Sequence, residues 1–272
     1  MARCDLIALD LDGTALLPDH TLAPETCRAI AAARVQGVRV VIATGRSSRE
    51  AAWFAREGGF DSHAAALGGA VVVDCETGKQ LRRWDLPRDG GREVLKLCLE
   101  RRLDPMIFAG EQILIPAWSA EALGRYFPRP VWEEDVVLLD DPLGWLEGYD
   151  GPLTKLHVEG DPARFPIREA AALPGMNLTS SGPGDFELIC QDIDKGTALA
   201  LLAEFYGIPL ERCAAVGDSE NDLGMLRAAG IAVAMGSACP AAVEAARFQV
   251  ADNLHHGAAQ AIALLLDRGL DF

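Results

Sequence analysis

An apolar run near the start of the chain, Leu6-Ile7-Ala8-Leu9, is followed by a helix-compatible stretch and then by a second apolar run. The helix-compatible stretch, Pro24 to Gln36, has proline near its first turn, and Gly37 is placed to end it. The second run, Val38 to Ala43, is continuous and rich in β-branched residues. Two buried strands joined by a crossover helix make a βαβ unit, so this part of the chain predicts a parallel sheet.

A turn and a helix are expected directly after the second run. Ser47-Ser48-Arg49-Glu50 has the spacing of a capping box, which predicts a helix through about Arg56 that Gly58-Gly59 would end. Thr44-Gly45-Arg46 would therefore lie on the turn between strand and helix.

The same alternation returns near the end of the chain. Ala214-Ala215-Val216 and Ile231 to Ala234 are predicted strands, and Leu223 to Ala229 and Ala258 to Leu266 are predicted helices. Together with the first segments, they predict an α/β fold whose core is a Rossmann-like doubly wound parallel sheet.

The middle of the chain, from about Leu81 to Gln191, differs in composition and pattern, because it contains most of the prolines and several short strand-like runs. We predict an inserted α+β domain in residues 82–185, within a core made of residues 1–81 and 186–272. The strands expected in the middle part are Met106–Phe108, Ile113–Ile115, Val136–Leu139, Leu156–Val158 and Phe186–Cys190. The expected helices are Glu93–Arg101, Ala120–Phe127 and Ala163–Ala172.

The charge balance argues against several classes of partner. The formal net charge is −15 and the pI is near 4.7, whereas nucleic acids and anionic membrane surfaces favour basic patches. No apolar run approaches the length of a membrane span, and no long apolar segment precedes the first acidic residues. The seven cysteines are odd in number and scattered, which is typical of reduced thiols. We expect a cytoplasmic protein, with monomer and homodimer both open.

Two aspartates directly follow the first predicted strand, in Asp10-Leu11-Asp12-Gly13-Thr14. Side chains two apart on a strand share a face, so the carboxylates would repel each other unless a cation or a shared proton relieved them. Three further polar segments stand at or near the carboxyl ends of predicted strands, where open α/β sheets bind ligands. They are Thr44-Gly45-Arg46, Asp194-Lys195-Gly196 and Gly217 to Asp222.

These segments carry side chains suited to a metal ion and a phosphoryl group. Mg²⁺ prefers oxygen ligands, and a cation opposite a lysine neutralises phosphoryl charge. The candidate metal ligands are Asp10, Asp12, Asp218 and Asp222. The candidate phosphate-binding residues are Thr44, Gly45, Lys195 and Asn221.

Each motif by itself also has a purely structural explanation. The acid pair could form a turn, and Thr44-Gly45 could be an ordinary N-cap. Lys195 could be a solvated helix-start residue, but a lysine gains nothing from the positive end of a helix unless an anion is present. His255-His256 are more typical of solvated or capping histidines than of metal ligands. The four motifs in this order favour the phosphoryl site.

The four motifs resemble the signature motifs of the haloacid dehalogenase-like (HAD) superfamily, and the chain is similar to its Cof-type phosphatases with a large α/β cap of type IIB. The resemblance implies that Asp10 attacks phosphorus and becomes an aspartyl-phosphate. It implies that Asp12 protonates the leaving alkoxide and then deprotonates the hydrolytic water.

The resemblance also implies a ligand set. The metal ligands would be Asp10, the carbonyl of Asp12 and Asp218, with Asp222 acting directly or through water. The phosphate would be bound by the N–H of Leu11 together with Thr44, Gly45, Lys195 and Asn221.

The same resemblance covers nearly the whole chain and implies that residues 82–185 form a cap, which excludes water and reads the leaving group. The expected substrate is a small phosphorylated metabolite, with a sugar phosphate as the first expectation and nucleotides, flavin mononucleotide and pyridoxal phosphate left open. Two departures weaken any transfer of substrate preference from relatives. Gly68-Gly69-Ala70 stands where many have Asn-Gly-Ala, and His256 stands where many have an acidic residue.

Two other functions remain open at this point. A phosphomutase of the same superfamily would return the phosphoryl group to a sugar hydroxyl. A phosphate-sensing regulator such as a two-component receiver also uses Asp, Lys, Thr and Mg²⁺. Receivers carry the phosphorylated Asp on a middle strand and need no long insert, whereas the candidate nucleophile here follows the first strand.

Overall fold

The computed structural model describes residues 4–123 and 136–267. The chain forms two compact units. The first combines Met1–Arg82 with Asp194–Phe272, and the second contains Arg83–Ile193. Each unit is built around its own sheet.

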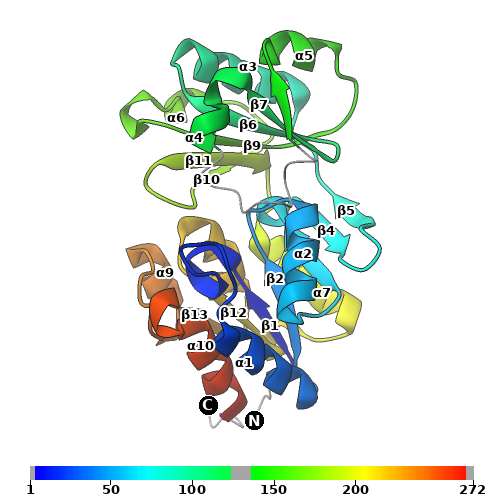
Figure 1. Ribbon diagram of the computed structural model, residues 1–272, viewed down its shortest axis with the longest axis vertical. Helices are drawn as coiled ribbons and strands as arrows, with labels where there is room; N and C mark the ends of the chain where they lie inside the picture. Colours follow the sequence, from blue (N-terminus) through cyan, green and yellow to red (C-terminus); the bar gives the residue numbers. More distant parts are fainter. Residues whose placement is uncertain (1–3, 124–135, 268–272) are drawn as a thin grey trace. The chain divides into compact units, whose positions relative to one another are not determined.

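The sheet of the first unit has eight strands, and its centre is parallel as predicted (Figure 1). Neighbouring strands run parallel from β14 to β3, whereas β4 pairs with β3 in the antiparallel direction. In spatial order the strands are β14 (Phe248–Gln249), β13 (Ile231–Ala234), β12 (Cys213–Gly217), β1 (Leu6–Leu9), β2 (Arg39–Ala43), β3 (His63–Ala66), β4 (Val71–Asp74) and β5 (Gln80–Arg83).

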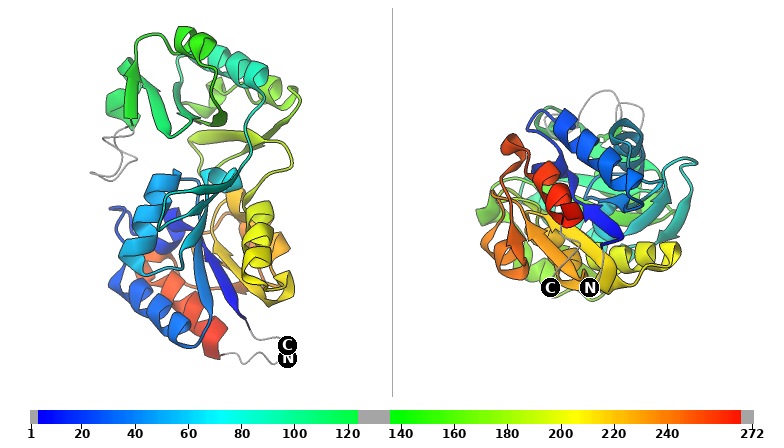
Figure 2. Two further views of the ribbon diagram at one scale, coloured as in Figure 1. Left: turned by 90° about the vertical axis from the view of Figure 1, so that its right-hand side faces the viewer. Right: turned by 90° about the horizontal axis from the view of Figure 1, so that it is seen from below.

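Helices cover both faces of this sheet (Figure 2). On one side lie α1 (Pro24–Val35), α2 (Ser48–Gly58) and α10 (Gly257–Asp267), with α1 in contact with the other two. On the other side lie α7 (Lys195–Tyr206) and α8 (Leu223–Ala228), and α9 (Pro240–Ala245) contacts α8. Every residue of β1 is buried, because a central parallel strand has helices on both sides. The predicted α/β fold is confirmed.

Local signals in the sequence account for α2. The Ser47 hydroxyl accepts a hydrogen bond from the backbone N–H of Glu50 at 3.3 Å, and the Glu50 carboxylate accepts one from the backbone N–H of Ser47 at 3.1 Å. This is the predicted capping box. Gly59 ends the helix at φ +70°, where a side chain is disfavoured.

The second unit has a six-stranded sheet that is antiparallel except for the β7–β8 pair. Its strands in spatial order are β10 (Met176–Thr179), β11 (Asp185–Cys190), β9 (Leu153–Glu159), β6 (Asp104–Ala109), β7 (Gln112–Pro116) and β8 (Val136–Leu139). Its helices are α3 (Arg88–Glu100), α4 (Ala120–Leu123), α5 (Pro142–Gly148) and α6 (Ile167–Ala171).

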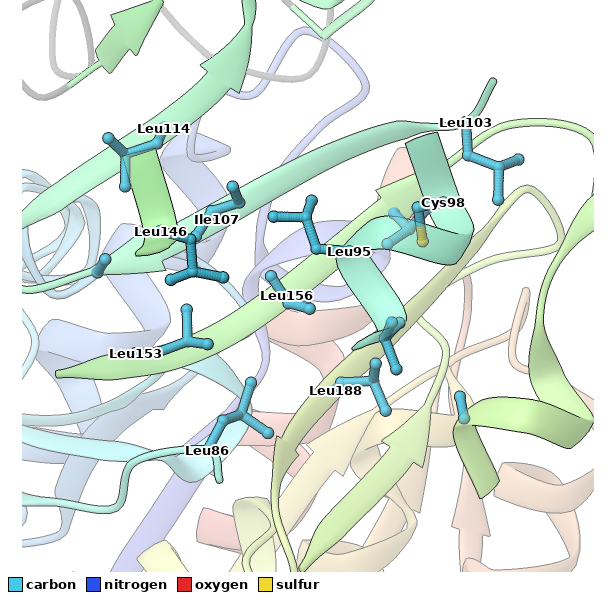
Figure 3. Close-up of a cluster of buried hydrophobic side chains, with 14 of the residues drawn as sticks. Leu86, Leu95, Cys98, Leu103, Ile107, Leu114, Leu146, Leu153, Leu156 and Leu188 are labelled. Atoms are coloured by element: carbon cyan, nitrogen blue, oxygen red, sulfur yellow. The ribbon is translucent and has the colours of Figure 1, made fainter. Parts of the chain in front are cut away.

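One face of this second sheet packs against α3 to form a separate hydrophobic core (Figure 3). Leu95 and Cys98 on α3 are fully buried together with Leu156 and Leu188 on the central strands. A core of its own is what an inserted domain needs to form a compact unit.

Two expectations for the middle of the chain need correction, and a third is tested only in part. The expected boundary at 186 falls inside β11, which pairs with β9 and β10, so the second unit continues to Ile193. The helix expected from Ala163 starts only at Ile167, because Pro166 interrupts it. The helix expected over Ala120–Phe127 begins as α4, and its part beyond residue 123 lies outside the described residues. The sequence did not predict α5 or β10.

Short helical turns connect several of these elements. They are η1 (Leu11–Ala15), η2 (Leu67–Gly69), η3 (Ala117–Ser119), η4 (Pro162–Arg164), η5 (Leu210–Arg212), η6 (Glu220–Asp222) and η7 (Asn253–His255). Two of them, η1 after β1 and η6 after β12, carry candidate site residues.

Candidate active site

The predicted site residues of the first unit follow the ends of β1, β2 and β12, and Lys195 links three of them. Lys195 is the first residue of α7 and its side chain is fully buried. Its ammonium donates to Asp10 Oδ1 at 2.6 Å, to Asp222 Oδ1 at 2.6 Å and to Asn221 Oδ1 at 3.0 Å. All three donor hydrogens of this lysine therefore have acceptors.

Asp222 holds the loop after β12 in shape. Its Oδ2 accepts hydrogen bonds from the backbone N–H of Asp218 at 2.8 Å and of Ser219 at 2.9 Å. Because both oxygens of Asp222 are engaged and the residue is fully buried, its clearest role in the structure is to shape this loop. The expected contribution of Asp222 to a metal site is therefore more indirect than that of Asp10 or Asp218.

The loop after β1 approaches Asp218 closely. The Thr14 hydroxyl donates to Asp218 Oδ1 at 2.8 Å. Gly13 lies at φ +78°, and a Cβ there would come within 2.4 Å of Asp218 Oδ2. Glycine is therefore required at this position by backbone conformation and by space.

The cluster is rich in negative charge. Asp10, Asp218 and Asp222 each offer an oxygen within 4.8 Å of the others. Burial, followed by the repulsion of Asp222, raises the pKa of Asp10 well above its ordinary value. Burial by itself lowers the pKa of Lys195, but Asp10 and Asp222 outweigh that effect and raise it. Three carboxylates around one ammonium leave excess negative charge, which a hard cation with oxygen ligands would neutralise.

The raised pKa of Asp218 leads to a prediction of how the stability of the metal-free protein depends on pH. Burial, followed by the charge of Asp222, raises the pKa of Asp218 from 3.8 to about 7. A carboxyl with a raised pKa stabilises the fold while it is protonated, so this stability is full below the unfolded pKa and is lost as pH rises through the folded one. We expect the free energy of unfolding in EDTA to fall between about pH 4 and pH 8, by on the order of 4 kcal/mol from this group.

Thermal unfolding of the wild type and of Asp218→Asn across this range measures the effect. The variant should lose less stability with rising pH, and Mg²⁺ should reduce the loss in the wild type. The same pH dependence in both proteins would contradict the assignment.

Thr44 and Gly45 lie on the turn between β2 and α2, as predicted. Thr44 is fully buried, and its hydroxyl oxygen accepts a hydrogen bond from the backbone N–H of Arg46 at 3.2 Å. The backbone N–H of Thr44 donates to Ala65 O at 2.9 Å. Because that N–H already has an acceptor, the hydroxyl is the group that Thr44 can offer to a ligand.

Asp12 stands apart from the other acids. Both of its oxygens are bound by the guanidinium of Arg46, through Nε at 2.7 Å and Nη2 at 2.6 Å. The side chain is about half exposed, unlike that of Asp10. Leu11, between the two aspartates, has a buried side chain. The acid pair thus divides, with one carboxylate on Lys195 and the other on Arg46.

Sequence reasoning assigned no role to Arg46 or His20. Glu50 was expected only as part of the capping box, yet it also accepts a hydrogen bond from Arg46 Nη1 at 2.8 Å. Nδ1 of His20 lies 2.8 Å from Arg46 Nη2. The spacing of four residues between Arg46 and Glu50 was a usable signal, since such pairs meet at the start of a helix. His20 had no comparable signal.

The two departures from the family pattern occupy left-handed backbone positions. Gly68 has φ +71°, and its N–H donates to Thr44 O at 2.9 Å. His256 has φ +60°, and its Nδ1 lies 3.7 Å from Glu25 Oε2. His255 instead contacts Asp252 at 2.7 Å. The two histidines contact different carboxylates, as expected for a capping or solvated pair.

A family model described as haloacid dehalogenase-like hydrolase matches residues 7–132 and 156–262 of this chain. The chain belongs to this family. The resemblance seen in the sequence motifs is therefore confirmed. The match spans both units, so the inserted unit belongs to the family architecture as well as the core.

Similar proteins agree with this assignment. The phosphatase YwpJ of Bacillus subtilis is 30% identical over 288 residues, which cover 96% of this chain and 99% of that protein. The 5-amino-6-(5-phospho-D-ribitylamino)uracil phosphatase YcsE of the same organism is 27% identical and covers 94% of both chains. The structure of a haloacid dehalogenase-like hydrolase from B. subtilis has a TM-score of 0.84 at 27% identity, and covers 95% of this chain and 99% of that one. The predicted enzyme class, phosphoric monoester hydrolase, is confirmed at this level.

Two further expectations were the absence of a membrane span and the presence of reduced cysteines. None of the helices in the described part of the chain is long and apolar enough to span a membrane. All seven cysteines lie in the described residues and are free.

Proposed function

We propose that this protein is a Mg²⁺-dependent phosphatase that hydrolyses a small phosphorylated metabolite through an aspartyl-phosphate on Asp10. The observation that supports this most strongly is the arrangement around Lys195. A fully buried ammonium contacts Asp10 and Asp222, while Asp218 lies within reach of the same cation position. Such an arrangement pairs a nucleophile with the charges that a phosphoryl group and a divalent cation need.

In the first step, an oxygen of Asp10 attacks phosphorus in line with the leaving oxygen. The bond from phosphorus to the ester oxygen breaks, and Asp12 gives that oxygen a proton. Burial raises the pKa of Asp12, but Arg46 outweighs burial and holds it well below its usual range, so Asp12 must take up this proton before the attack. The ester leaves as an alcohol, and the phosphoryl group remains on Asp10. A buried lysine on Asp10 fixes the orientation of the nucleophile for this attack.

In the second step, a water molecule attacks the phosphorus of the aspartyl-phosphate. Asp12, now a carboxylate, takes the proton of that water, and the bond between phosphorus and Asp10 breaks. Inorganic phosphate leaves, and both aspartates return to their starting forms. One group thus acts first as acid and then as base.

The residues around the two aspartates would hold the substrate's phosphoryl oxygens. Lys195 and Asn221 already contact each other at 3.0 Å, and the Thr44 hydroxyl lies at the end of the neighbouring strand. The backbone N–H groups of Leu11 and Gly45 complete the proposed set. Asp10, the Asp12 carbonyl and Asp218 would hold Mg²⁺, with Asp222 acting directly or through water, and the cation would neutralise charge that develops on the phosphoryl oxygens.

The substrate class is proposed from the family. We infer a sugar phosphate or a related polyol phosphate, with the leaving group read by the inserted unit, Arg83–Ile193. The relative YcsE bears the name of a phosphatase for a phosphorylated ribitylamino compound, which is a substrate of this class. The acidic composition and the free cysteines support a cytoplasmic enzyme whose partner is a small metabolite rather than a nucleic acid or a membrane.

Phosphate release from a panel of phosphorylated metabolites tests this function. We expect turnover of one or more sugar or polyol phosphates with Mg²⁺ and a loss of at least about 100-fold in excess EDTA, because the carboxylate cluster then lacks its cation. Added Mg²⁺ should restore the rate. Full activity in EDTA would remove the metal from the mechanism.

The same assay separates the alternative functions. A burst of phosphoenzyme without free phosphate, followed by transfer to a sugar hydroxyl, would indicate a phosphomutase. Slow loss of phosphate from an isolated phosphoprotein, with no turnover of small esters, would indicate a regulator of the receiver type.

A further inference from the structure

The guanidinium of Arg46 holds the carboxylate of Asp12 by two parallel hydrogen bonds. Nε donates to Oδ2 at 2.7 Å and Nη2 donates to Oδ1 at 2.6 Å. This bidentate geometry fixes the plane of the carboxylate as well as its position, which a single contact cannot do.

The two partners differ sharply in exposure. The Asp12 side chain is 47% exposed, whereas that of Arg46 is 7% exposed. A half-exposed aspartate ordinarily samples several rotamers, so its direction here depends on the buried side chain beneath it. Arg46 is thus the rigid member of the pair.

The first turn of α2 in turn holds the side chain of Arg46. Its Nη1 donates to Glu50 Oε1 at 2.8 Å, and Glu50 is almost fully buried. The other oxygen of Glu50 accepts from the Ser47 hydroxyl at 2.9 Å and from the Ser47 backbone N–H at 3.1 Å. The guanidinium also lies 5.5 Å from the ring centroid of Phe54 on the same helix. A continuous chain of contacts therefore runs from the cap of α2 to Asp12.

We propose that Arg46 is the positioning residue for Asp12, and that Glu50 keeps Arg46 in place. The role rests on the proposed function, in which Asp12 transfers the proton to the leaving oxygen. Proton transfer requires the donor at hydrogen-bond distance from that oxygen, so a carboxyl group that samples several orientations would transfer its proton more slowly. Arg46 does not touch the phosphoryl group in this role, and its effect passes through Asp12.

The role predicts a dependence on the leaving group. p-Nitrophenolate leaves without a proton, whereas the phenolate of phenyl phosphate benefits from one. The value of kcat/KM reports the steps up to departure of the leaving group, so it isolates the acid step from later hydrolysis. We expect Arg46→Gln to lower the ratio of kcat/KM for phenyl phosphate to that for p-nitrophenyl phosphate by about 10-fold or more.

Three variants distinguish positioning from charge or stability. Arg46→Lys keeps the positive charge but cannot make the two parallel hydrogen bonds of a guanidinium, so the ratio of the two kcat/KM values should stay low. Recovery to the wild-type ratio would overturn the proposal. Arg39→Ala removes another arginine of the same unit, one that pairs with the buried Asp61 at 2.8 Å, and should leave the ratio unchanged. Because Arg46→Gln leaves Glu50 buried without its partner, the ratio is also measured in the double variant Arg46→Gln/Glu50→Gln, which removes both charges. The ratio should be as low as in Arg46→Gln, and a wild-type ratio would trace the loss to the unpaired Glu50 and overturn the proposal.

A double-mutant cycle completes the test. In the Asp12→Asn background, Arg46→Gln should lower the ratio no further, because its effect passes through Asp12. A further fall of similar size would show that Arg46 acts independently, and would overturn the proposal. If Asp12→Asn by itself leaves the ratio unchanged, the acid role in the proposed function is wrong. A low ratio in Asp12→Asn with a normal ratio in Arg46→Gln overturns only the positioning role.

Discussion

Asp10→Asn is expected to lower the rate of phosphate release by at least about 10⁴-fold, because the amide cannot form the aspartyl-phosphate. Steady-state release of phosphate from the best substrate of the panel measures the loss. Rapid acid quench adds a second readout, since the phosphoenzyme should be trapped in the wild type and absent from the variant.

The fold should survive this change. Lys195 keeps its hydrogen bonds to Asp222 and Asn221, and loss of the Asp10 charge relieves repulsion from Asp222. We therefore expect the melting temperature to stay within a few degrees of the wild-type value. Asp19→Asn, in an exposed position of the loop after β1, is the matched control and should retain wild-type activity. Phosphate release by Asp10→Asn within tenfold of the wild type would exclude Asp10 as nucleophile.

Lys195→Met is expected to remove activity and also to destabilise the core unit. The lysine is fully buried and is the cation that contacts both Asp10 and Asp222. Removing one member of a buried ion pair costs about 3–5 kcal/mol, because the remaining charge is left buried without a partner. For a unit of this size, that corresponds to a fall in melting temperature of roughly 10 °C.

The direction of pH dependence separates this effect from simple loss of packing. The destabilisation of Lys195→Met should grow as pH rises, because burial raises the pKa of Asp10 and this carboxyl must then ionise without the ammonium beside it. Mg²⁺ should recover part of the melting temperature and little of the activity. Lys79→Met, at an exposed position of the same unit, should change neither quantity. A melting temperature of Lys195→Met equal to that of the wild type at every pH would contradict the structural role of the pair.

Local sequence patterns were sufficient to predict the first strand and the first two helices of the core unit. The apolar run before Asp10 predicted β1, and Pro24 and Gly37 marked α1 within one or two residues of its observed ends. Both depend on neighbours in the chain, through side-chain periodicity and backbone geometry. The capping box at Ser47 was predicted for the same reason and is present.

Similar local signals were weaker in the inserted unit. Pro166 shortened a helix whose composition favoured an earlier start, and the four-residue β10 has no long apolar run. The predicted boundary at 186 assigned the strand Phe186–Cys190 to the core, but the hydrogen bonds of β11 to β9 and β10 place it in the second sheet. Strand pairing is a contact between distant segments, so no local window of sequence can specify it.

By itself, the sequence determined that Asp10, Lys195, Asp218, Asn221 and Asp222 would gather at one end of a parallel sheet, because strands of one direction bring their carboxyl ends to the same edge. Only the tertiary structure decided how the two acids of the first motif are used. Asp10 faces the ammonium of Lys195, while Asp12, two residues later, faces a guanidinium 34 residues away. That division depends on the angle at which the turn after β2 presents Arg46, and such an angle is set by packing of α2 rather than by residue type.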